Sequence, residues 1–188
     1  MPTRIEEWDQ RYRTGEQAFE TPSPLVVAFA GGLKPGLALD LACGPGRNAL
    51  YLAAHGWRVT ALDGSRVAID LLLARARQRT LSVEARVVDL EADEFHVEPE
   101  TYDLVLSCYY LQRNLIPQMK SALRPGGLLI MIVHLAGAAQ PTGTATRAYP
   151  GELRALFDGW RISDYREGAP MESCHRHAVA ELVAQKPE

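Results

Sequence analysis

Short apolar segments and helical segments alternate along most of the chain, and this order limits the folds that the sequence can adopt. Strands that pair in parallel need a crossover connection, which is usually a helix. The segments expected to form strands are residues 37–42, 58–62, 83–88, 102–107 and 128–135, and those expected to form helices include residues 48–55, 67–79 and 115–123. We therefore expect a mostly parallel sheet with helices on both of its faces.

The last third of the sequence departs from this alternation. A short helix is expected at residues 152–157, and the apolar segments 160–167 and 178–184 follow with no helix between them. Two strands without a crossover form an antiparallel pair. The sequence therefore predicts an α/β fold with a doubly wound, mostly parallel seven-stranded sheet and an antiparallel hairpin at one edge.

The length of 188 residues fits a single domain, and no linker divides it. Residues 1–24, called the lead-in here, read as an extension with a helix near residues 5–13, and the prolines Pro22 and Pro24 separate it from the next helix. A net charge of -3 argues against nucleic acid as a partner. The longest apolar stretch, residues 128–139, is too short to cross a membrane, and three widely spaced cysteines favour a reduced, cytoplasmic setting.

A glycine-containing turn follows the first expected strand and reads Asp40-Leu-Ala-Cys-Gly44-Pro-Gly46-Arg-Asn48. Glycines let the backbone turn sharply and approach a ligand closely. The segment Gly44-Pro-Gly46-Arg-Asn-Ala49 also matches the dinucleotide pattern G-x-G-x-x-G/A, so the glycines alone do not distinguish the cofactors.

Three aspartates stand at the ends of the first three expected strands. Asp40 lies within the end of the strand that precedes the glycine turn, where a carboxylate suits an ammonium group and repels a pyrophosphate. Asp63 ends the second strand, where it can accept hydrogen bonds from ribose hydroxyls, and Asp89 ends the third, where it can accept from an adenine amine. The set favours a nucleoside that carries an ammonium group.

These motifs, in this order, resemble the class I S-adenosylmethionine-dependent methyltransferases, whose fold is Rossmann-like. The resemblance rests on residues 39–46, Ala61-Leu-Asp63, Val88-Asp89, Tyr102-Asp-Leu-Val105 and Leu123-Arg-Pro-Gly-Gly127. The lead-in segment Trp8-Asp-Gln-Arg-Tyr12 is similar to that of the thiopurine and tellurite-resistance branch. One departure is Ala42, where the family has glycine, and alanine fits that position if its φ stays negative.

The resemblance implies S-adenosylmethionine as the cofactor and one set of residues around it. Asp40 would lie near the ammonium group, Asp63 would hold the ribose and Asp89 the adenine, while Cys108 would offer its carbonyl to the ammonium group. The lead-in would close over the cofactor. The complete expected set is Trp8, Tyr12, Phe19, Asp40, Ala42, Gly44, Gly46, Asn48, Asp63, Gly64, Ser65, Asp89, Leu90 and Cys108.

The methyl acceptor is expected to be a small molecule, and a thiol or a chalcogen compound would need no base at neutral pH. We name no catalytic residue. Candidates on the acceptor side are Tyr109, Tyr110, Arg113, His134 and Tyr149, with Arg147 nearby, and residues 137–150 could form a lid.

The segment Cys174-His-Arg-His177 contains metal-ligating residue types, but alternation along a strand would place Cys174 opposite the two histidines, so we expect no metal. Two other functions stay open at this point. One is an NAD(P)-dependent oxidoreductase, against which stand Asp40 and the lack of a Tyr-x-x-x-Lys arrangement. The other is a protein that binds S-adenosylmethionine without catalysis.

Overall fold

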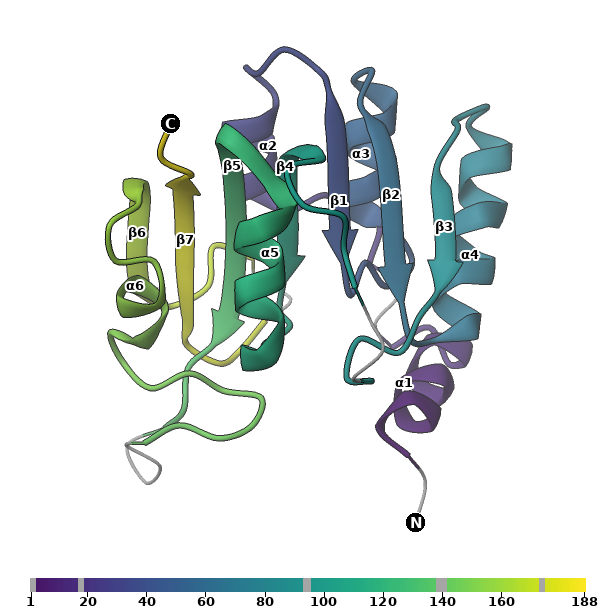
Figure 1. Cartoon of the computed structure of the whole chain (residues 1–188). Coiled ribbons are helices and arrows are strands. Elements are labelled where there is room, and N and C mark those ends of the chain that lie inside the picture. The colour runs from purple at the N-terminus through teal and green to yellow at the C-terminus, as the bar shows by residue number, and fades with distance from the viewer. Residues whose placement is uncertain (1–2, 17–18, 93–95, 138–141, 173–174) are drawn as a thin grey trace. The chain divides into compact units, whose positions relative to one another are not determined.

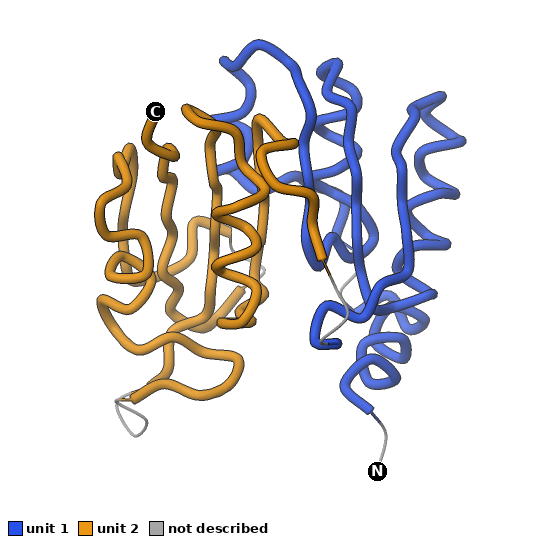
Figure 2. Tube along the Cα trace, viewed as in Figure 1, with its two compact units in different colours: residues 1–95 blue, residues 96–188 orange. Residues whose placement is uncertain are grey.

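The computed structural model describes residues 1–188 except 1–2, 17–18, 93–95, 138–141 and 173–174. The chain divides into two compact units, residues 1–95 and residues 96–188 (Figure 2). Each unit carries strands and helices of its own, and each is described by itself below.

Unit 1 contains three parallel strands, β1 (Leu37–Leu41), β2 (Arg58–Asp63) and β3 (Glu84–Val87), in the order β3-β2-β1 (Figure 1). Leu37 pairs with Arg58, and Thr60 pairs with Glu84. Because the three strands are parallel, their carboxyl ends lie at one edge of the sheet.

The helices of unit 1 are α1 (Arg4–Arg13), α2 (Pro24–Ala30), α3 (Arg47–Ala54) and α4 (Arg66–Gln78). Local sequence explains their starts: Thr3 and Glu6 form a capping box before α1, and Ser65 caps α4 by accepting from Ala68 N. Helix α3 packs on β1 and β2, and α4 packs on β2 and β3. Helix α1 contacts α4 and lies beyond the carboxyl ends of β2 and β3 (Figure 1).

Unit 2 contains β4 (Tyr102–Cys108), β5 (Leu123–His134), β6 (Arg161–Gly168) and β7 (Val179–Gln185), in the order β4-β5-β7-β6. Strands β4 and β5 are parallel, whereas β7 runs antiparallel to both β5 and β6. A 3₁₀ turn (Arg113–Leu115) leads into α5 (Ile116–Ala122), which packs on β4 and β5, and α6 (Glu152–Leu156) precedes β6.

The seven strands, mostly parallel with one reversed strand near an edge, confirm the fold class expected from the sequence. The position of β7 is an addition, because the last strand inserts between β5 and β6 instead of forming the edge. The core follows the strand pattern, since all but the last residue of β7 and most of β5 are buried. No helix among the described residues is long and apolar enough to cross a membrane.

Two local expectations were wrong. The strand expected at residues 128–135 begins at Leu123, so Arg124-Pro-Gly-Gly127 lies within β5, where a register shift between Tyr102–Leu123 and Leu104–Leu128 accommodates the extra residues. Two backbone hydrogen bonds hold this irregular start of β5: Gly126 N donates to Lys186 O at 3.1 Å, and Lys186 N donates to Gly127 O at 2.9 Å. Residues 175–177 lie in a loop before β7 and not in a strand, and Cys174 lies outside the described residues.

Candidate functional site

The turn between β1 and α3 closes tightly against neighbouring side chains. Gly46 has φ +83°, and a Cβ placed on it would lie 2.4 Å from Cγ of Leu72 in α4. Its glycine is therefore required by the packing of the turn on α4, and not by a ligand alone. At Gly44, a Cβ would lie 3.1 Å from the hydroxyl oxygen of Tyr12, so the lead-in already covers this part of the turn.

Ala42, at the start of the same turn, has φ +53°. The condition under which alanine fits this position without strain, a negative φ, is therefore not met. An alanine in the left-handed region costs about 1–2 kcal/mol because its Cβ approaches the following carbonyl oxygen. The turn therefore holds an alanine in a conformation that favours glycine, and strain of this kind is concentrated at functional sites.

Asp63, the last residue of β2, is buried and holds the turn through both carboxylate oxygens. Its Oδ2 accepts from Gly44 N at 2.8 Å, and its Oδ1 accepts from Ser65 N at 2.8 Å. Burial raises the pKa of Asp63 above its ordinary value, and these two backbone hydrogen bonds oppose the rise. Both oxygens keep further lone pairs, so Asp63 can still accept from hydroxyl groups of a ligand.

Asp40 in β1 is 2% exposed, and its Oδ2 is buried without a hydrogen-bond partner among the described residues. Burial and the neighbouring Asp63 raise the pKa of Asp40, while Arg47 and a backbone hydrogen bond from Ala49 lower it, and the net result is a pKa of about 7. An unpaired buried carboxylate is costly, and a cation in hydrogen-bond reach would relieve that cost. Asp40 is thus suited to a positively charged ligand group.

The third aspartate lies at the same edge but is exposed. Asp89 follows β3 by two residues, and its Oδ1 accepts from Glu91 N at 2.9 Å. The next residue, Leu90, is buried. Asp40, Asp63 and Asp89 therefore stand at the carboxyl ends of three adjacent parallel strands of unit 1, as the sequence predicted.

The lead-in is attached to this edge through α1. Asp9 accepts from the Ser65 hydroxyl and from Val67 N, the latter at 3.3 Å, so it adds a second carboxylate cap to α4. The Ile5 side chain would lie 3.1 Å from a Cβ placed on Gly64. Trp8 stacks on Tyr12 with a centroid separation of 5.6 Å. Burial, then Asp63 and Cys43, raise the pKa of the Tyr12 hydroxyl, so it stays protonated.

Phe19 and Asn48, both expected near a cofactor, make contacts within unit 1. Asn48 is buried and its Oδ1 accepts from Ser23 N at 2.9 Å, which ties the end of the lead-in to α3. The Phe19 ring lies 5.8 Å from the guanidinium carbon of Arg47. These contacts give both residues a structural role in seating the lead-in.

In unit 2, aromatic and imidazole rings gather beyond the carboxyl ends of β4 and β5. Tyr109, directly after β4, has φ +64° and stacks on His175 with centroids 3.6 Å apart, while its hydroxyl donates to Glu172 Oε1 at 2.8 Å. His134, the last residue of β5, lies 5.3 Å from the Tyr109 ring and 6.0 Å from the His177 ring. We call these four rings the ring cluster.

His134 is held neutral within the ring cluster. Its Nδ1 is buried without a hydrogen-bond partner among the described residues. Burial, and after it the charges of His175, Arg147 and His177, together lower the pKa of His134 to about 4. Sequence reasoning placed Tyr109 and His134 in this region but missed His175 and His177, because it treated residues 174–177 as part of an edge strand.

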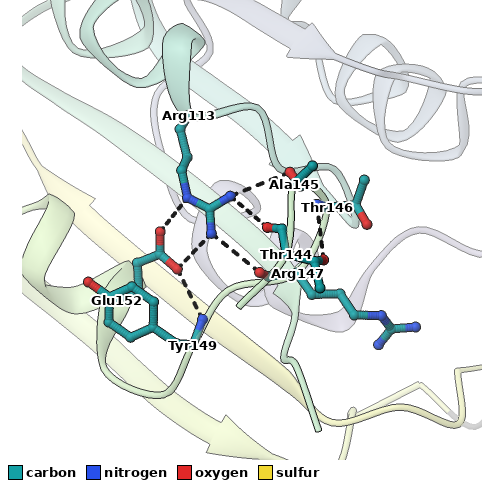
Figure 3. A network of polar contacts seen from close by, with 7 residues as sticks. All are labelled: Arg113, Thr144, Ala145, Thr146, Arg147, Tyr149 and Glu152. Atoms are coloured by element: carbon teal, nitrogen blue, oxygen red, sulfur yellow. Dashed lines mark hydrogen bonds and ion pairs between the residues drawn. The ribbon is translucent and has the colours of Figure 1, made fainter. Parts of the chain in front are cut away.

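Arg113 and Tyr149 contribute to a polar network after β5 (Figure 3). Arg113 forms a bidentate ion pair with the buried Glu152 and also donates to backbone carbonyls, so its guanidinium is held by the protein. The Tyr149 ring is 40% exposed. Tyr110 accepts at its carbonyl from the Ser107 hydroxyl at 3.2 Å, and Cys108 ends β4 half-buried. Within the described residues, no three His, Cys, Asp or Glu side chains are grouped to hold a metal ion.

The fold of the chain is shared by solved structures of S-adenosylmethionine-dependent methyltransferases. The crystal structure of TehB from Haemophilus influenzae has a TM-score of 0.76 with this chain at 23% identity, and the match covers 95% of this chain and 67% of that one. A Burkholderia thailandensis 1,6-didemethyltoxoflavin-N1-methyltransferase, solved with S-adenosylhomocysteine, has a TM-score of 0.68 at 18% identity, covering 98% and 87%.

A family model described as "Tellurite resistance protein TehB" matches residues 9–179, and the chain belongs to this family. A probable S-adenosyl-L-methionine-dependent methyltransferase TehB from Haemophilus influenzae is 28% identical over 151 residues, which are 76% of this chain and 52% of the relative. The chain thus spans about half the length of the curated relatives it matches.

Proposed function

We propose that the chain is an S-adenosylmethionine-dependent methyltransferase that acts on a small molecule, and that the acceptor atom of this molecule is sulfur, selenium or tellurium. The observation that carries the proposal is Asp40, whose buried carboxylate oxygen has no partner among the described residues and stands beside Asp63 and the glycine turn. A ligand that combines an ammonium group with ribose hydroxyls matches these two carboxylates. NAD carries a pyrophosphate there instead, which the buried acid would repel.

The residues of unit 1 fit the cofactor as follows. Asp40 would hold the ammonium group, Asp63 the ribose hydroxyls, and Asp89 with Leu90 the adenine. When bound, the cofactor supplies a sulfonium methyl group, and the protein's contribution is to align an acceptor with it, which lowers the barrier by up to about 7–11 kcal/mol. The lead-in would exclude water, because Tyr12 lies against Gly44 of the glycine turn and Trp8 stacks on Tyr12.

The acceptor class follows from the ring cluster. His134, with its pKa lowered to about 4, is a weak base. The Tyr109 hydroxyl donates a hydrogen bond to Glu172. An alcohol or phenol acceptor generally needs a base near neutral pH, whereas a thiolate or a chalcogen oxyanion does not. The name of the family, tellurite resistance, supports a chalcogen acceptor.

Calorimetry with two ligands tests the cofactor assignment. S-adenosylhomocysteine carries the ammonium group, and 5'-methylthioadenosine lacks it. We expect Asp40→Asn to weaken S-adenosylhomocysteine by about tenfold or more and to leave 5'-methylthioadenosine unchanged, because a charged hydrogen bond contributes about 1.5–3 kcal/mol. Asp63→Ala should weaken both ligands. Binding of NAD in place of S-adenosylhomocysteine would exclude the proposal.

Methyl transfer itself is tested by measuring S-adenosylhomocysteine formation with a simple aliphatic thiol, with selenite and with a catechol as acceptors. We expect product with the thiol or selenite and not with the catechol. Product with the catechol alone would contradict the acceptor class. Tight cofactor binding without product from any acceptor would favour the second candidate function, a binding protein without catalysis.

A further inference from the structure

Glu152, the first residue of α6, is a buried acid whose partner lies 39 residues earlier in the chain. Its side chain is 5% exposed, and a buried carboxylate needs a paired charge. Arg113, which begins the 3₁₀ turn before α5, supplies it: Nε lies 2.6 Å from Oε1 and Nη2 lies 2.9 Å from Oε2. This bidentate geometry is the strong form of a carboxylate pair.

The remaining donors of Arg113 hold the segment 144–149, which we call the acceptor-side loop. Nη1 donates to the carbonyls of Thr144 at 2.8 Å and Ala145 at 3.4 Å, and Nη2 donates to the carbonyl of Arg147 at 3.3 Å (Figure 3). With the two bonds to Glu152, all five N–H donors of the guanidinium are used. None is left for a substrate.

Glu152 holds the same loop from its other end. Its Oε2 accepts from Tyr149 N at 3.0 Å in addition to Nη2 of Arg113. Thr144 N donates to Arg147 O at 2.9 Å, which closes the loop into a turn. One ion pair therefore fixes both ends of a segment that contains no other regular structure.

The loop in turn is paired with the end of β5. Ala148 N donates to His134 O at 2.9 Å, and Ala136 N donates to Ala148 O at 2.8 Å. The Arg147 side chain donates from Nη1 to Leu135 O at 3.2 Å, and its charge acts on the His134 imidazole. A continuous set of contacts thus runs from the Arg113–Glu152 pair to the backbone of His134.

We propose that Arg113 and Glu152 are positioning residues that fix His134 against the acceptor through the acceptor-side loop, without touching the acceptor themselves. This inference rests on the proposed function, which places the acceptor at the ring cluster. The groups that face His134 are Tyr109, His175 and His177 in the cluster and Arg147 in the loop. Release of the loop would remove Arg147 from this set and expose the imidazole to water.

The test is to measure the pKa of His134 by NMR, without any ligand, in the wild type and in the variants Arg113→Lys and Glu152→Gln. Lysine keeps the charge but has no planar fork to reach the carboxylate and the carbonyls together. In both variants we expect the pKa of His134 to rise by about one unit or more, because the positive charge of Arg147 and the burial that disfavour the imidazolium are lost. Hydrogen exchange at Ala148 N should accelerate in parallel.

The matched control is Arg124→Lys. Arg124 pairs with Asp103 at 2.9 Å in the same unit, and its Nε donates to the carbonyl of Glu100 at 3.3 Å. The pKa of His134 in Arg124→Lys should equal its pKa in the wild type. If Arg113→Lys and Glu152→Gln lower stability but leave the His134 titration unchanged, the pair is structural only and the proposal is overturned.

Kinetics with the thiol or selenite acceptor provide the functional readout. We expect the acceptor KM to rise at least about tenfold in Arg113→Lys, while the KM for S-adenosylmethionine stays unchanged. An equal rise in both constants would overturn the proposal. If the wild type methylates none of the acceptors, the proposed function fails, but the His134 titration still decides whether the pair positions this histidine.

Discussion

The left-handed conformation of Ala42 predicts an unusual response to glycine. At an ordinary helical position, such as Ala74 in α4, an alanine-to-glycine change costs about 1 kcal/mol, because glycine loses more backbone freedom on folding. At Ala42 the same cost is offset by relief of the left-handed conformation, about 1–2 kcal/mol, since φ is +53°. Ala42→Gly should therefore be neutral or stabilise the protein by up to about 1 kcal/mol.

Ala74→Gly is a matched control because both alanines lie in unit 1 and both are half-buried, so the loss of a methyl group contributes similarly. The difference between the two variants isolates the conformational cost, about 1–2 kcal/mol. In urea unfolding, this difference separates the two midpoints by about 0.5–1 M for a slope of about 2 kcal/mol per M. Equal losses of stability in the two variants would refute the conformational argument.

Two further predictions concern buried charges. The pKa of Asp40 is raised from 3.8 to about 7 in the folded protein, so the folded state holds a proton that the unfolded state releases. The stability of the folded state should therefore fall as pH rises from about 4 to about 7. Asp40→Asn should flatten this part of the profile of urea midpoint against pH, and an unchanged profile would contradict the assigned burial. In β7, Glu181 is buried and its Oε2 lies 2.6 Å from Nε of Arg166. Arg166→Ala should therefore lower the free energy of unfolding, measured in urea, by about 2 kcal/mol. This is less than for a fully buried pair, because the Arg166 side chain is 38% exposed. Arg161→Ala, on the exposed end of the same hairpin, should change stability by less than about 0.5 kcal/mol, and equal effects would argue against the pair.

The sequence predicts those features that depend on neighbours along the chain. Strand and helix types follow from the period of apolar residues, and the acids of unit 1 meet at one edge because parallel strands end together. The glycine turn is likewise local. This is why Asp40 and Asp63 could be named in advance as neighbours.

The features that sequence reasoning missed depend on distant partners. Arg113 and Glu152 are 39 residues apart, and nothing near either residue shows that the arginine is fully used by the protein. The insertion of β7 between β5 and β6 follows from pairings over the whole sheet, as does the start of β5 at Leu123. The φ of Ala42 could not be predicted from the residue type, because the turn sets the conformation.

The place of β7 also determines when unit 2 can fold during synthesis. β5 pairs with β7 over seven residues, from Leu128–Gln185 to His134–Val179, and β6 has β7 as its partner on the inner side. A ribosome must therefore release residue 185 before β6 can join the sheet, and until then the growing chain exposes one whole side of its most apolar strand. Chaperones that bind nascent apolar segments would find their target there, and slow translation of the last residues would prolong that exposure.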